Sequence, residues 1–159
     1  MEKFLLIFAA VALPGQAAAN DDFKSISFRK WADETPQIII CDNSVDFSIV
    51  VKSVEFWRKH GFKMSNPQKR NNCKSNILKN HIKFIKNTDN SNLKENENGA
   101  TDRLFTKTKM YGANITIRDT LRDQQALVTH ELGHALGLNH SPDVENVMYY
   151  KKRYYAFNR

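Results

Sequence analysis

Three histidines stand close together near one end of this 159-residue chain. In the stretch HELGHALGLNH they are His130, His134 and His140, and Gly137 separates the second from the third. Residues four apart on a helix lie on one face with Cβ atoms about 5–6 Å apart, so His130 and His134 can reach one ion. Glycine readily adopts the left-handed conformation that ends a helix, which would bring His140 back toward the same point. The spacing therefore predicts a helix ending near Gly137 and a metal site with three imidazole ligands.

The residue types of this motif favour a catalytic zinc site. Three neutral imidazoles leave the fourth position of tetrahedral zinc open to water, whereas a structural site is closed. Glu131 follows the first histidine and points about 100° away around the helix, so it lies beside the ion rather than on it. Zinc would lower the pKa of the water, and Glu131 would accept its proton as it attacks a peptide carbonyl. A non-catalytic, zinc-bearing binding module is the alternative, but such a module has no use for the glutamate.

The segment from His130 to Tyr149 resembles the metzincin zinc endopeptidases. The stretch HELGHALGLNHS is followed by PDVENVMY, which is similar to the methionine turn of that group. Ser141 after the third histidine, and the eight-residue step from His140 to Met148, are most similar to the matrixins. The resemblance implies that the three histidines bind zinc, that the glutamate is the catalytic base, and that Met148 forms an apolar floor beneath the metal. It also implies a protein or peptide substrate.

An α/β fold of the α+β zincin type is expected, with a mixed twisted sheet, a long N-terminal helix and the zinc helix. Only nine residues follow Tyr150, so the C-terminal subdomain should be minimal. In matrixins an edge strand pairs with an extended substrate, and we expect Tyr111 to Ile115 to have this role. Hydrophobic periodicity and turn residues predict strands at Gln37–Cys41, His81–Ile85, Leu104–Met110 and Ala113–Arg118, helices at Val45–His60 and Leu121–Gly137, and a loop at Ser65–Asn80.

Two further ligand sets follow from the resemblance as hypotheses. Tyr150 stands where matrixins usually have proline, and its position is similar to that of the extra, movable zinc ligand of astacins. Matrixins also bind calcium, and a polar loop carries carboxylates that could hold it, although a solvated loop is favoured because their spacing matches no known calcium loop. These carboxylates are Asp89, Glu95, Glu97 and Asp102.

The N-terminal residues have the pattern of an export signal. Lys3 precedes the apolar run Phe4–Leu13, Pro14 ends the helix-forming stretch, and small residues at 17–19 form a cleavage site. Ten apolar residues are too few to span the roughly 30 Å core of a bilayer, so no membrane span is expected. We expect a signal peptide at 1–19 and a single secreted or periplasmic catalytic domain at 20–159, although a buried N-terminal helix is the alternative.

Charge and cysteine content add two expectations. Cys41 and Cys73 are the only cysteines, and in an exported chain they are expected to form a disulfide, with two free thiols as the alternative. The net charge of +7 could attract an anionic partner, but many of the lysines alternate with Asn, Ser and Gln between Lys63 and Lys94. No nucleic-acid-binding motif accompanies them. We therefore expect a solvated basic loop, no specific nucleic-acid partner and a monomer.

Overall fold

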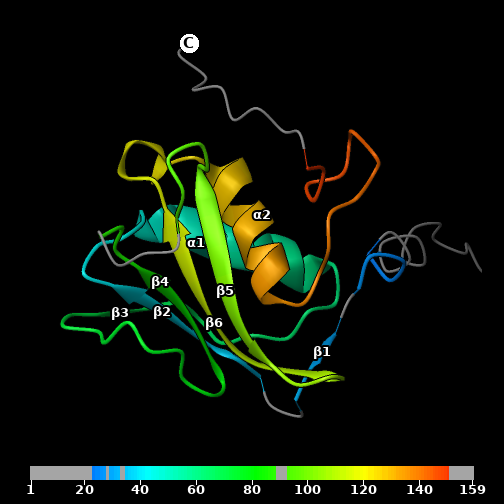
Figure 1. The fold of residues 1–159 in the computed structure, drawn as a ribbon, viewed down its shortest axis with the longest axis horizontal. Helices are drawn as coiled ribbons and strands as arrows, with labels where there is room; N and C mark the ends of the chain where they lie inside the picture. The colour runs from blue at the N-terminus through cyan, green and yellow to red at the C-terminus, as the bar shows by residue number, and fades with distance from the viewer. Residues whose placement is uncertain (1–22, 28, 33–34, 89–92, 151–159) are drawn as a thin grey trace, which may run out of the picture.

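The computed structural model describes residues 23–150 except 28, 33–34 and 89–92 (Figure 1). The expected signal segment and Asp89 lie outside these residues. No helix in the described part of the chain is long and apolar enough to cross a membrane. The elements are β1 (Lys30–Trp31), β2 (Gln37–Cys41), α1 (Phe47–Lys59), β3 (Gln68–Arg70), β4 (His81–Ile85), β5 (Gly99–Phe105), β6 (Lys109–Ile117), a 3₁₀ turn (Asp119–Leu121) and α2 (Gln125–Ala135).

The strands form one mixed sheet. Strands β3, β2, β4 and β6 lie side by side in parallel, and β1 continues beside the start of β6, also in parallel. Strand β5 pairs with β6 in the antiparallel direction, on the side of β6 that β4 and β1 leave open. The expected mixed α/β class is confirmed.

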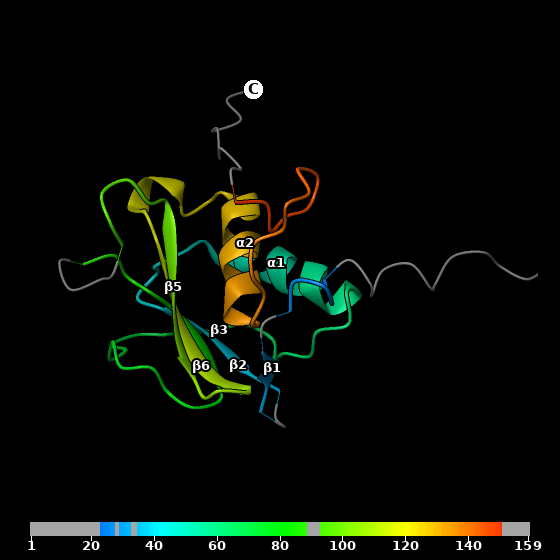
Figure 2. The ribbon, with the colours of Figure 1, turned by 45° about the vertical axis from the view of Figure 1, so that its right-hand side comes forward.

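Both helices lie on one face of the sheet (Figure 2). The hydrophobic core fills the space between the helices and the sheet. Alternate residues of the strands point toward the helices. Trp57 of α1 and Leu132 of α2 are fully buried against these strand residues. Burying a large apolar side chain contributes roughly 1.5–3 kcal/mol to stability. The strand residues form two rows across the sheet, Ile38–Ile82–Ala113 and Ile40–Phe84–Ile115.

The opposite face of the sheet is covered by the polar segment 71–80. Cys41 and Cys73 are joined by a disulfide, with Cα atoms 5.7 Å apart. The ammonium of Lys83, on the same face of β4, donates to the carbonyl oxygens of Lys74 and Asn76 at 2.6 and 2.5 Å. Lys83 is 3% exposed, and this burial lowers the pKa of its ammonium. A disulfide and a buried cation thus fasten the basic loop to the sheet.

Several predicted boundaries are wrong. The predicted loop Ser65–Asn80 contains the short strand β3, whose three residues are all exposed and carry no apolar signal. The first helix begins after Asp46, because the Asp46 carboxylate accepts from the amides of Ser48 and Ile49 and so caps the helix. The second helix, expected from Leu121, begins at Gln125 after the 3₁₀ turn.

The two predicted strands before α2 also have different bounds in the structure. Strand β5 extends over Gly99–Phe105 and β6 over Lys109–Ile117, so Tyr111 and Gly112 lie inside β6 rather than between two strands. Gly112 is needed there because a Cβ atom would collide with the carbonyl oxygen of Leu78.

The expected substrate-pairing edge is wrong for the same reason. Residues 111–115 have β4 on one side and β5 on the other. Their backbone groups are therefore already used in the sheet. Within the described residues, β5 has β6 as its only strand partner, so β5 supplies the edge beside α2.

Candidate active site

Helix α2 carries the first two histidines on its buried side. The indole Nε1 of Trp57 donates to the carbonyl oxygen of Thr129 at 2.9 Å, and the Thr129 hydroxyl lies 2.8 Å from that of Ser53. Both contacts join α2 to α1. The helix is therefore fixed one residue before His130 by groups that are themselves buried.

A sharp turn after α2 brings the third histidine back. Gly137 has φ +94°, and its backbone lies so close to the carbonyl of Arg29 that a side chain would not fit. The amide of Asn139 donates to the carbonyl of Ile26 at 2.8 Å, which ties the turn to the N-terminal segment. The predicted role of Gly137 agrees with this geometry, and His140 follows directly.

The three imidazoles converge. Ligand atoms of His130, His134 and His140 all lie within 4.8 Å of one another, and the Nε2 atoms of His134 and His140 are 3.1 Å apart. Nitrogen ligands of tetrahedral zinc at 2.0–2.1 Å would be roughly 3.4 Å apart. No other group of three or more His, Cys, Asp or Glu side chains in the described residues is arranged to hold a metal.

Backbone carbonyls orient the imidazole rings. The Nδ1 atom of His130 lies 2.8 Å from the carbonyl oxygen of Val147, and that of His134 lies 2.9 Å from the carbonyl oxygen of Leu138. A carbonyl can only accept, so each Nδ1 carries the proton and each Nε2 presents a lone pair. This is the usual arrangement of histidine ligands. The donor set therefore fits a zinc ion.

The surroundings also favour neutral histidines. Burial, together with the nearby His130, lowers the pKa of His134 from 6.5 to about 3. Burial, followed by the charge of Arg103, lowers the pKa of His140. Metal binding requires the neutral imidazole, so protons compete weakly for His134 at physiological pH.

Glu131 is buried beside the histidines, and strand β5 contacts it. Its side chain is 6% exposed, and its Oε2 lies 2.7 Å from the Thr101 hydroxyl, which donates to it. Burial raises the pKa of Glu131 from 4.5 to about 7, and the hydrogen bond from Thr101 opposes this shift. The carboxyl is thus poised to titrate near neutral pH.

Thr101 and Gly99 are site residues that the sequence did not reveal. A Cβ atom at Gly99 would be 2.8 Å from Cγ of Glu131, so the glycine backbone forms a wall of the carboxylate site. Both residues belong to a polar strand about 30 positions before the histidine motif. No short motif links them to it, so no sequence signal was available.

Met148 and Tyr150, two residues apart, differ in burial. Met148 is fully buried, and its sulfur lies against Gly133 of α2. The carbonyl of Met148 accepts from the amide of Ser141 at 2.8 Å. Tyr150 is 55% exposed, with its ring centroid 6.3 Å from that of His140. Tyr150, Glu131 and the histidines all line one cleft of about 520 Å³.

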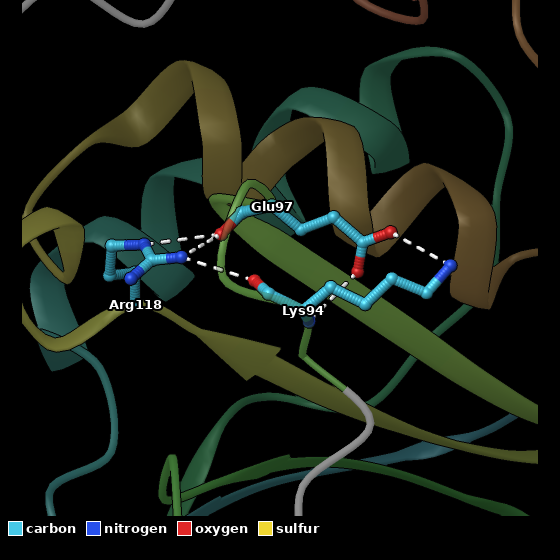
Figure 3. Close-up of polar contacts among 3 residues, drawn as sticks. All are labelled: Lys94, Glu97 and Arg118. Atoms are coloured by element: carbon cyan, nitrogen blue, oxygen red, sulfur yellow. Dashed lines mark hydrogen bonds and ion pairs between the residues drawn. The ribbon is translucent and has the colours of Figure 1, made fainter.

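Of the carboxylates considered for calcium, the three in the described part of the chain, Glu95, Glu97 and Asp102, do not form a group that could hold a metal. Glu97 instead forms an ion pair with Lys94, with Nζ 3.7 Å from Oε1. The backbone carbonyls of the same turn accept hydrogen bonds from Arg118 (Figure 3).

Comparison with known proteins agrees with this geometry. No curated protein matches the chain. The matrixin family matches it over residues 16–158, which is most of its length. Matrixins are zinc metallopeptidases that are generally secreted, and three histidines that could hold the metal lie together in this structure. The chain belongs to the matrixin family.

Proposed function

We propose that the chain is a zinc-dependent endopeptidase in which His130, His134 and His140 bind the metal and Glu131 is the general base. One observation carries the proposal: three converging imidazoles, two of them with Nε2 lone pairs left by their Nδ1 hydrogen bonds, share a cleft with a buried carboxyl group. A site that only stored zinc would gain nothing from a carboxyl desolvated beside it. Met148 forms the apolar floor of this site.

Glu131 is suited to moving protons. Zinc, when bound, acts as a Lewis acid and lowers the pKa of water. A carboxyl with a pKa of about 7 can accept a proton and return it at neutral pH. The hydroxyl of Thr101 holds one carboxylate oxygen, so the other is left to face the attacking water and then the departing amine.

The edge of β5 is suited to binding an extended peptide. Its outer side has no strand partner in the described residues, and its first residues lie beside Glu131. A peptide that added a strand there would place its main chain along the cleft. We propose that residues 20–159 form one catalytic domain that is exported, in line with the disulfide Cys41–Cys73.

The test compares wild type, Glu131→Gln and the metal-free protein on casein and on a fluorogenic peptide mixture. Wild type with one equivalent of zinc should cleave, and Glu131→Gln should lose at least a hundredfold in kcat while keeping its zinc. His81→Ala, a histidine outside the cluster, is the control and should retain activity. A zinc-loaded wild type that binds peptides but cleaves none would support the binding-module alternative instead.

A further inference from the structure

We propose that Arg118 is a positioning residue whose guanidinium acts as a built-in cation for the turn at 94–97. By holding this turn, Arg118 places the start of β5 against Glu131. The kinetic part of this proposal rests on the proposed endopeptidase function, whereas its structural part does not.

Arg118 gathers three backbone carbonyls around its side chain, and Figure 3 shows those of Lys94 and Glu97. Its Nη2 donates to the carbonyl oxygens of Glu95 and Glu97, both at 2.6 Å, and to that of Lys94 at 3.2 Å. Its Nε donates to the carbonyl of Glu97 at 3.1 Å. The turn therefore directs its oxygen atoms at one cationic group.

A cation at its centre stabilises such an arrangement. Carbonyl dipoles that point at a common centre repel one another, and in many loops a hard metal ion offsets that repulsion. The guanidinium is always charged and offers several donors in a rigid plane. The positive charge is thus part of the chain itself, on Arg118, the residue that follows β6.

The other contacts of the turn are weaker. The amide of Glu97 donates to the carbonyl of Lys94 at 3.0 Å, and the Lys94–Glu97 ion pair is solvent-exposed. Exposed ion pairs contribute about 0–1 kcal/mol. The half-buried guanidinium therefore links this turn to the end of β6.

The link continues directly to the catalytic carboxyl. The amide of Arg118 donates to the carbonyl of Asn98 at 2.9 Å, and Gly99, which follows, pairs with Ile117. Gly99 and Thr101 of β5 both contact the Glu131 side chain. A shift of the turn would therefore move the wall of the carboxylate site, and misplacements of about 1 Å can reduce rates by about 10².

The test uses zinc-loaded Arg118→Ala, Arg118→Lys and Arg122→Ala. Arg122 is the matched control, because its guanidinium also donates to backbone carbonyls, those of Asn43 and Asp119, away from the cleft. For Arg118→Ala we expect a kcat lower by roughly 10- to 100-fold, with zinc content unchanged and KM within about threefold. Arg118→Lys should retain an intermediate kcat, and Arg122→Ala should match wild type.

Three further measurements separate positioning from general damage. Amide hydrogen exchange in segment 94–101 should quicken at least tenfold in Arg118→Ala, while exchange in α2 stays as in wild type. Added methylguanidinium or calcium should restore part of the kcat. In a Thr101→Val background, Arg118→Ala should lower kcat by less than threefold further, because both changes act on the same wall.

Unchanged exchange in segment 94–101 of Arg118→Ala would overturn the proposal, as would an equal loss of kcat in Arg122→Ala. If zinc-loaded wild type cleaves no peptide, the proposed function fails, and the exchange data still decide the role of Arg118.

Discussion

Gly99 lies directly against the side chain of Glu131, such that a Cβ atom at position 99 would be 2.8 Å from Cγ and 3.0 Å from Oε1. Gly99→Ala should therefore displace the carboxylate and lower kcat by roughly 10- to 100-fold, with zinc still bound. Leu78→Ala changes an exposed leucine in segment 71–80, on the opposite face of the sheet, and should leave kcat unchanged. Steady-state kinetics and zinc analysis of both variants check this. Equal activity of Gly99→Ala and wild type would contradict the assigned contact.

The pKa of Glu131 predicts a pH dependence of stability in the metal-free protein. Burial raises the folded-state pKa of this carboxyl from 4.5 to about 7, so the folded protein binds more protons than the unfolded chain between these values. The contribution of Glu131 to the free energy of unfolding is thus most favourable below pH 4.5 and is lost as the pH rises through 7. Glu131→Gln removes this titration, so its stability relative to wild type should rise by up to about 3 kcal/mol between pH 4.5 and 8.

The titration of His134 changes the free energy of unfolding with pH in the opposite direction to that of Glu131. Burial lowers its pKa to about 3, so its contribution is present above pH 6.5 and is lost as the pH falls toward 3. Both proteins contain His134, so the difference between their urea unfolding curves isolates Glu131. A difference that stays constant over this pH range would contradict the raised pKa.

Removing the metal should destabilise the protein through the three histidines. A ligand present at a thousand times its Kd stabilises the folded state by about 4 kcal/mol. Calorimetry should therefore show a lower Tm after chelation, and His140→Ala should respond far less to chelator. His81→Ala should respond as wild type does, and a full response of His140→Ala would argue against His140 as a ligand.

The disulfide should contribute to stability without affecting catalysis. It closes a loop with a sequence separation of 32 residues on the face of the sheet opposite α2, and loops of this size are expected to contribute roughly 3–4 kcal/mol. The double variant Cys41→Ser, Cys73→Ser should lose about that much in urea unfolding and keep its kcat. Reductant should destabilise wild type but not the double variant. A similar effect of reductant on both proteins would contradict the disulfide between Cys41 and Cys73.

Tyr150 remains a hypothesis as an additional ligand, since its ring centroid lies 6.3 Å from that of His140. Replacing zinc by cobalt gives a coloured site whose absorption reflects ligand number and geometry. Tyr150→Phe should shift this absorption if the phenol ligates. An unchanged spectrum together with unchanged kcat would show that Tyr150 is not a metal ligand.

Sequence patterns predicted correctly those features whose residues all belong to a single strand or helix. The strands Gln37–Cys41 and His81–Ile85 were predicted with the bounds observed, because the first is a short apolar run and the second alternates apolar and polar residues. His130 and His134 share a helix, so their spacing alone reveals their convergence.

Strand β5 was misjudged for a physical reason. It lies at the edge of the sheet and faces the cleft, so its residues are polar and lack apolar alternation. The contact of Thr101 with Glu131, and that of Arg118 with the turn at 94–97, join distant segments that only the folded sheet brings together.

Both tryptophans of the chain donate hydrogen bonds to the backbone of α2: Trp57 to Thr129 at 2.9 Å near its start, and Trp31 to Ala135 at 3.0 Å at its end. The indole emission of the whole molecule therefore originates from groups attached to the histidine-bearing helix. Fluorescence intensity and wavelength should follow loading of the site and any distortion of the helix. The protein thus carries its own optical reporter, so titrations need no added label.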